Sequence, residues 1–221
     1  MMRRSRALVV GAALWAVSSS GCGATRVANT PRVGGEFAGS TDAALARLSQ
    51  RPAWLFPFDQ CPADVFPGVE SPLDYRGQEC ASNIEPCLNR CQSDDPNACY
   101  VTALVLQRMN APAEYSEALF LKACSLGGAS GCTNRAAGII VHSPDDAVPW
   151  PCVNRTFEAM CRQDDPWACT MWGKSLLHGL GMPSDVARAR QVLPKGCRLS
   201  EDDLACVTAR KLLAEIGGMS I

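Results

Sequence analysis

Pairs of cysteines eight or nine positions apart recur from residue 91 onward and constrain the fold more than any other feature. The pairs are Cys91 with Cys99, Cys124 with Cys132, Cys161 with Cys169, and Cys197 with Cys206. Their first members are 33, 37 and 36 residues apart along the chain. Self-similarity at a period in the middle thirties is typical of repeats that each consist of two helices. We therefore expect an all-α superhelical solenoid of about three to four helical hairpins.

The spacing within each pair predicts where disulfides form. In one continuous helix, residues eight apart are separated by about 12 Å along the axis, whereas a disulfide needs α-carbons within about 4.4–6.8 Å. Each pair can therefore close only where the chain reverses between two helices, and each bond would contribute about 2.5 kcal/mol. Zinc is the weaker alternative, because structural zinc sites prefer two to four residues between ligands. The sequence also offers only two histidines, His142 and His178. We expect no metal and no cofactor.

Local signals place two helices in the third repeat. Asp165 is a suitable N-cap and is followed by a proline at the first helical position, so we expect a helix over 166–178. A turn rich in glycine ends it, and a second helix starts near Asp185 and runs toward the next cysteine pair. Pro194 would disturb the last turn of that helix. A lone helix over 202–216 would close the stack.

The first 21 residues have the form of an export signal. Three arginines precede an apolar stretch that is about half as long as a membrane span requires. Ser20, Gly21 and Cys22 resemble the lipobox of bacterial lipoproteins, which implies that Cys22 carries the lipid. The alternative is an ordinary signal peptide cut between residues 18 and 24. Lipidation of Cys22 would leave an even number of the 13 cysteines, as expected in an oxidising compartment.

The segments between the export signal and the repeats are less regular. Residues 22–40 are rich in glycine, serine and threonine and would form a flexible tether. Residues 41–80 combine a short helix over 41–49 with an irregular stretch of prolines and aromatic side chains. We expect this segment to cover the open N-terminal end of the repeats as a cap; alternatively, it is a recognition segment of its own. The repeats occupy 81–216, and 217–221 form a tail.

Four further cysteines have no partner at the repeated spacing. They are Cys61, Cys80, Cys87 and Cys152, and they allow three pairings among which the sequence does not choose. We favour Cys61 with Cys80, because both border the irregular segment. That choice leaves Cys87 to pair with Cys152.

The third repeat carries a recognisable motif. The stretch WGKSLLHGLGMPSDVARARQVLPKGC, residues 172–197, resembles the Sel-one-like repeat, a relative of the tetratricopeptide repeat. The matching residues are Gly173, Gly179, Gly181, Asp185, Arg188 and Ala189. The cysteine positions further resemble the cysteine-rich bacterial subfamily. The resemblance covers about residues 80–216 and implies a right-handed superhelix that binds proteins or cell-wall ligands.

Some members of that subfamily are described as β-lactamases or penicillin-binding proteins, which implies an enzymatic alternative. Serine β-lactamases need Ser-x-x-Lys and Lys-Thr-Gly segments. In this sequence no lysine follows a serine by three residues, and Lys-Thr-Gly does not occur. Two histidines are few for a zinc enzyme. We therefore expect a non-catalytic binding protein, exported and lipid-anchored to the bacterial envelope, where it faces the periplasm or the cell surface.

The resemblance also implies where a partner would bind, because the first helix of each repeat lines the concave surface. Trp167, Met171, Lys174 and His178 form one stripe at helical spacing, whereas Ala168, Trp172 and Leu176 are expected to face the interior. The alternative is that Trp167 packs on the preceding corner and the other three face solvent. The equivalent positions of the other repeats share no charge pattern, which favours a protein or peptide partner. The net charge of −1 argues against nucleic acid.

Overall fold

The computed structural model describes residues 34–55, 59–70, 80 and 83–218. These residues form an all-helical protein in which no strand occurs, so the all-α prediction is confirmed for them. None of the helices in these ranges is long and apolar enough to cross a membrane. The predicted export signal, its lipidated Cys22 and the tether up to residue 33 lie outside the described residues.

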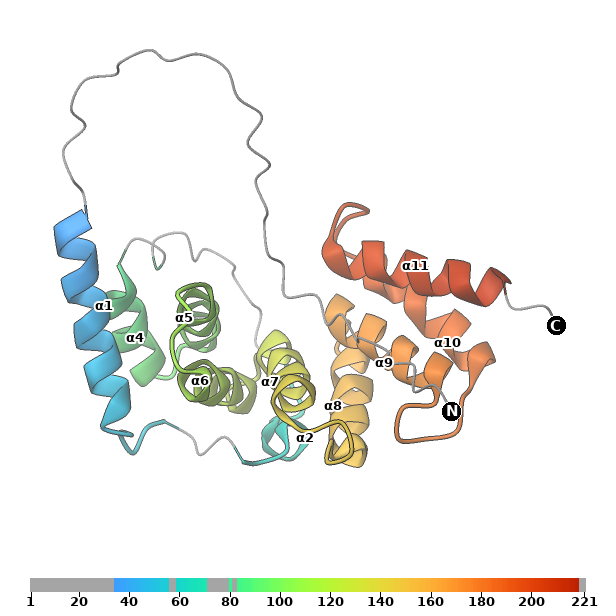
Figure 1. Cartoon of the computed structure of the whole chain (residues 1–221), viewed down its shortest axis with the longest axis horizontal. Helices are drawn as coiled ribbons and strands as arrows, with labels where there is room; N and C mark the ends of the chain where they lie inside the picture. The colour runs from blue at the N-terminus through green and yellow to red at the C-terminus, as the bar shows by residue number, and fades with distance from the viewer. Residues whose placement is uncertain (1–33, 56–58, 71–79, 81–82, 219–221) are drawn as a thin grey trace, which may run out of the picture. The chain divides into compact units, whose positions relative to one another are not determined.

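The helices follow one another in a repeat-like order (Figure 1). They are α1 (Gly34–Ser49), α2 (Pro62–Val65), α4 (Ile84–Gln92), α5 (Pro96–Arg108), α6 (Ala113–Ser125), α7 (Ala129–His142), α8 (Trp150–Arg162), α9 (Pro166–His178), α10 (Val186–Val192), the 3-10 helix η1 (Leu193–Cys197) and α11 (Leu204–Gly218). Each helix from α4 to α8 packs against the next helix of the chain, and α9 packs against α8, α10, η1 and α11.

The helix boundaries follow the local signals closely in the third repeat. Helix α9 has the predicted bounds, and Asp185 caps α10 by accepting a hydrogen bond from the N–H of Arg188 at 2.9 Å. Pro194 lies in the 3-10 helix that replaces the last α-helical turn, as its missing N–H and fixed backbone angle require. Helix α1 begins at Gly34, so the predicted tether is wrong over residues 34–40.

The four repeated cysteine pairs are bonded in the structure. The α-carbons are 4.5 Å apart in Cys91–Cys99, Cys124–Cys132 and Cys161–Cys169, and 4.1 Å apart in Cys197–Cys206. Such short distances over eight or nine residues require the chain to reverse between the two cysteines. Each bond joins a cysteine in the last turn of one helix to a cysteine in the first turn of the next.

Three of these corners share one backbone arrangement. The third residue after the first cysteine is left-handed: φ is 65° at Asp94, 91° at Gly127 and 61° at Asp164. The N–H of each donates to the carbonyl oxygen of that cysteine at 2.9–3.1 Å. Aspartate and glycine adopt this conformation more readily than most residues. The Asp-Asp and Gly-Gly sequences therefore determine where the chain reverses between two helices.

The residue after the left-handed position starts the next helix. Asp95 and Asp165 are extended N-caps, and Asp165 accepts a hydrogen bond from the N–H of Ala168 at 2.8 Å. Asp165 also accepts from the hydroxyls of Ser130 at 2.7 Å and Thr133 at 3.1 Å, both on α7. Its buried carboxylate thus joins the start of one repeat to the preceding one.

Buried side chains form three clusters along the chain. The first joins α1 and α4–α6 and includes Leu48, Leu88 and Phe120. The second joins α7–α11 and includes Phe157 and Trp172. The third surrounds the Cys124–Cys132 and Cys161–Cys169 disulfides. Ala168, Trp172 and Leu176 are at most 4% exposed, which confirms that they face the interior.

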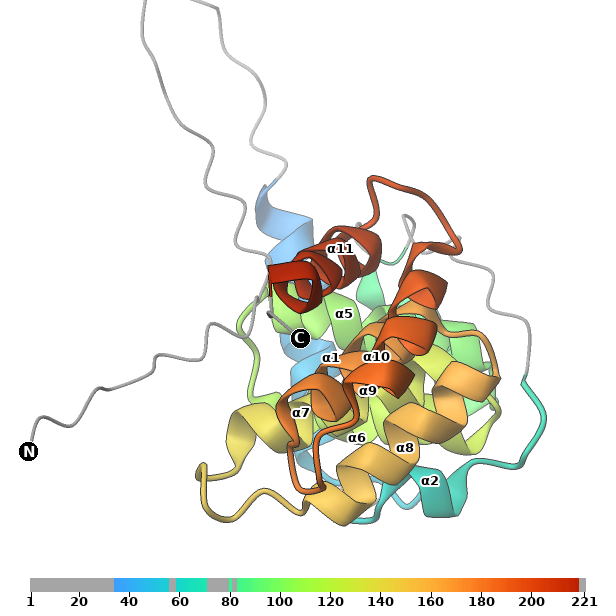
Figure 2. The same cartoon turned by 90° about the vertical axis from the view of Figure 1, so that its right-hand side faces the viewer.

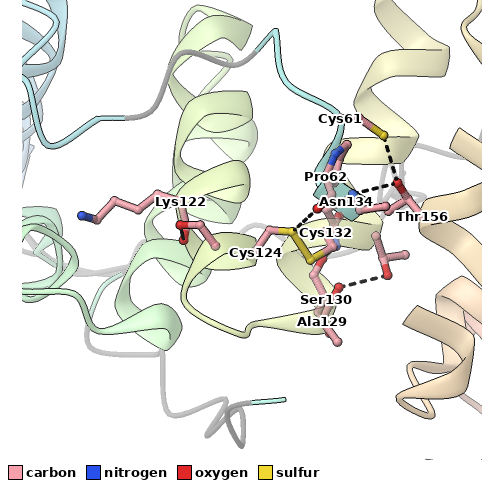
Figure 3. Close-up of a disulfide and its surroundings, with 12 residues drawn as sticks. Cys61, Pro62, Lys122, Cys124, Ala129, Ser130, Cys132, Asn134 and Thr156 are labelled. Atoms are coloured by element: carbon pink, nitrogen blue, oxygen red, sulfur yellow. Dashed lines mark hydrogen bonds between the residues drawn. A yellow bond between two sulfur atoms is a disulfide. The ribbon is translucent and has the colours of Figure 1, made fainter. Parts of the chain in front are cut away.

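The described part of the irregular N-terminal segment extends past the first repeat. Residues 59–66, called the strap below, cross to the middle of the array, where α2 contacts α6, α7 and α8. Figure 2 shows α2 beside α8. The disulfide sulfur of Cys124 lies 3.3 Å from the carbonyl oxygen of Pro62 (Figure 3). Val65 and Phe66 pack on the third cluster. Helix α1, which contains the predicted helix over 41–49, packs on α4 at the start of the array, and Trp54 and Leu55 pack on the first cluster.

This docking corrects the favoured pairing of the other four cysteines. Cys61 is bonded to Cys152 of α8, and Cys80 is bonded to Cys87 of α4. The prediction of Cys61 with Cys80 was wrong because the strap runs past the first repeat before it docks. The bond between Cys61 and Cys152 spans 91 residues of sequence, whereas the other bonds span seven to nine.

Candidate functional site

The predicted stripe on α9 is only partly available to a partner. Trp167, Met171 and Lys174 are half-buried, and His178 is exposed. Met171 packs against the second cluster, and the Nε2 atom of His178 lies 3.9 Å from the carboxylate of Glu215 on α11. Helix α11 packs directly on α9 and places Glu215 beside His178.

A cavity of 500 Å³ lies elsewhere, beneath the strap. It is bounded by the start of α6, the second half of α7, the 143–149 connection and the start of α8. Strap residues 59–61 form its remaining wall. The cavity therefore brings together three stretches of the chain that are far apart in sequence, 59–61, 113–117 and 135–152. None of its residues belongs to the predicted stripe.

Glu117 of α6 and Arg135 of α7 form a buried ion pair in the wall of this cavity. An Nη atom of Arg135 donates to Oε2 of Glu117 at 3.0 Å, and the two residues are 7% and 3% exposed. The other carboxylate oxygen, Oε1, accepts no hydrogen bond from any described residue. The Nε2 atom of His142 lies 3.5 Å from that oxygen, too far for a good hydrogen bond. Glu117, a residue of the cavity wall, therefore has one buried acceptor without a hydrogen bond.

The surroundings of Glu117 shift its titration to neutral pH. Burial disfavours the charged form and raises the pKa of Glu117 to about 7, although the charge and hydrogen bond of Arg135 act in the opposite direction. Burial also lowers the pKa of Arg135, while Glu117 and Asp59 counteract that shift. Near pH 7 the carboxyl group can therefore gain or lose a proton when a charged ligand arrives.

Two helical glycines allow α7 to approach α6 closely enough for this pair. A β-carbon at Gly131 would lie 2.8 Å from the side chain of Ala123, and one at Gly138 would collide with the carboxylate of Glu117. The two glycines are seven residues apart and so lie on the same face of α7. Glycine within a helix costs stability, so its presence at both contacts indicates a packing requirement.

The strap is fastened to α8 beside the cavity by several contacts. Cys61 is bonded to Cys152, and Asp64 forms an ion pair with Arg155 at 2.7 Å. The hydroxyl of Thr156 accepts a hydrogen bond from the N–H of Ala63 at 3.2 Å and lies near Cys61 (Figure 3). These contacts hold residues 59–61 over the cavity.

The sequence contained one signal for this site that its interpretation did not use. Gly131 and Gly138, seven residues apart in α7, mark the face on which a close contact forms. Across the described ranges, no group of three or more histidine, cysteine or acidic residues could hold a metal ion. Comparison of the chain with protein-family models, with curated proteins and with solved structures finds no match.

Proposed function

We propose that this protein is an exported, non-catalytic binding scaffold that holds a peptide or protein partner in the cavity beneath its strap. Its helical hairpins would stack as a solenoid of the Sel-one-like kind, and a lipid on Cys22 would hold it at the bacterial envelope. Six disulfides support an oxidising location, because such bonds do not persist in a reducing cytosol.

The observation that carries the binding proposal is the unused oxygen of Glu117. A buried carboxylate oxygen without a hydrogen-bond donor costs free energy, and native proteins keep few such atoms. A ligand that supplies the donor would recover that cost. The cavity combines this polar atom with apolar walls, the usual composition of a binding pocket.

Selection of displayed random peptides on the purified, oxidised protein tests the proposal. We expect enriched peptides whose binding is lost in Ala113→Trp, because a large side chain at the start of α6 would fill the cavity. Trp167→Ala is the matched variant for the α9 stripe and should leave binding unchanged.

Three results would contradict the proposal. Loss of peptide binding in Trp167→Ala but not in Ala113→Trp would move the site to α9. Failure to enrich any peptide would argue against a binding scaffold. Hydrolysis of a chromogenic β-lactam by the purified protein would contradict the non-catalytic part.

A further inference from the structure

The charges around the cavity favour a cationic ligand. Three carboxylates line it, those of Asp59, Glu114 and Glu117. Arg135 and His142 are the basic side chains in the lining, and the charge of Arg135 is already paired with Glu117. Glu114 is itself ion-paired with Arg51 at 3.5 Å, so the acidic excess of the lining rests on Asp59, and an anion entering the cavity would meet repulsion from it.

Oε1 of Glu117 further limits which chemical group of a ligand fits the cavity. Oε1 of Glu117 requires a donor, and a primary ammonium group has three donors and no acceptor. A hydrogen bond between an ammonium and a carboxylate is roughly twice as strong as one between neutral groups. An amide or hydroxyl could also donate, but neither would use the acidic excess.

The remaining walls suit an alkyl chain. Ile139, Pro149 and Cys152 line the cavity together with the acidic groups. A lysine side chain combines four methylene groups with a terminal ammonium, and it commonly packs the methylenes on apolar surface. A cavity of 500 Å³ has room for such a side chain.

We propose that the cavity binds a primary ammonium group carried on an alkyl chain, in the form of a lysine side chain of the partner, with Glu117 as its acceptor. This inference rests on the proposed function, since it names the anchoring residue of the peptide or protein partner. Glu117 acts as the binding residue, and Arg135 positions its carboxylate.

The titration of Glu117 gives the inference a pH signature. Its pKa is raised to about 7 without ligand, and an ammonium ion favours the charged carboxylate. An amine stays protonated below pH 9, so affinity should rise about tenfold from pH 6 to pH 8. The other charged or titratable groups that line the cavity are Asp59, Glu114, Arg135 and His142.

Calorimetric titration of the full exported protein tests this inference with defined probes. The probes are lysine blocked as Nα-acetyl N′-methylamide, the same molecule acetylated on its side chain, and cadaverine. We expect blocked lysine to bind, with affinity lowered at least tenfold by acetylation and at least tenfold by Glu117→Gln. Glu158→Gln is the matched control, because Glu158 is also paired with an arginine, Arg188 at 2.7 Å, but does not line the cavity.

The titrations of the wild-type protein with the different probes test the inference even if Glu117→Gln does not fold. Equal affinity for free and acetylated lysine, or an affinity that does not rise from pH 6 to pH 8, would overturn the inference. If cadaverine binds and blocked lysine does not, the ligand is a free amine, and the proposal of a lysine side chain is overturned. If no amine binds while selected peptides still depend on position 113, the inference fails and the proposed function stands.

Discussion

At the scale of single residues, the buried carboxyl of Glu117 makes stability depend on pH in an unusual direction. Its folded-state pKa of about 7 exceeds the value of 4.5 for an ordinary glutamate. Between these values the folded protein binds more protons than the unfolded chain, so its stability falls as pH rises. Most native carboxylates have the opposite effect.

We predict that the titration of Glu117 makes the free energy of unfolding fall by about 2–3 kcal/mol as the pH rises from 5 to 8. The side chain is 4% exposed, so solvent screening does not reduce this figure much. Urea unfolding of the wild type and of Glu117→Gln at both pH values measures it, because Arg135 stays charged throughout. Identical pH slopes in the two proteins would contradict the assignment.

A second residue-scale prediction concerns the buried cap Asp165. Ser130→Ala removes one hydrogen bond to its carboxylate, and bonds to charged groups are worth about 1.5–3 kcal/mol. We expect the free energy of unfolding to fall by that amount in chemical denaturation. Ser49→Ala is the control, since the Ser49 hydroxyl is exposed and bonds only within its own helix in the described structure. Equal losses in both variants would show that Asp165 does not depend on Ser130.

At the scale of elements, the corners depend on backbone conformation as well as on disulfides. Gly127→Ala places a side chain at φ 91°, where L-residues are strained, and should lower the free energy of unfolding by about 1–3 kcal/mol. The same change at Gly217, in helix α11 with no atom within 4 Å of the added carbon, should raise stability by about 0.5–1 kcal/mol. Thermal unfolding of both variants checks the opposite signs, and a loss of equal size at both positions would contradict them.

At the scale of the whole molecule, the strap disulfide should stabilise more than any corner. Closing 91 residues contributes about 4–5 kcal/mol in the chain-entropy description, against about 2.5 kcal/mol for a loop of eight. Replacing Cys61 and Cys152 with alanine should therefore cost more in chemical denaturation than replacing Cys91 and Cys99. A smaller cost would show that the strap is held mainly by its other contacts.

The corners and most helices could be predicted because their causes are local. An aspartate cap and a proline at the first helical position act within one turn, and each corner cysteine finds its partner only eight or nine residues away. The same holds for Pro194 and the 3-10 helix that contains it. Such features depend on neighbours in sequence, and these neighbours are visible in the printed chain.

The candidate site could not be predicted because its causes are distant. The ion pair of Glu117 with Arg135 depends on the rotation of α6 against α7, and on glycines at the contact. The cavity depends on a strap that docks beyond the first repeat, so its cysteine finds a partner 91 residues away. The α9 stripe depends on where α11 packs. Local backbone preferences decide where helices begin and end, whereas long-range packing decides which of their faces meet.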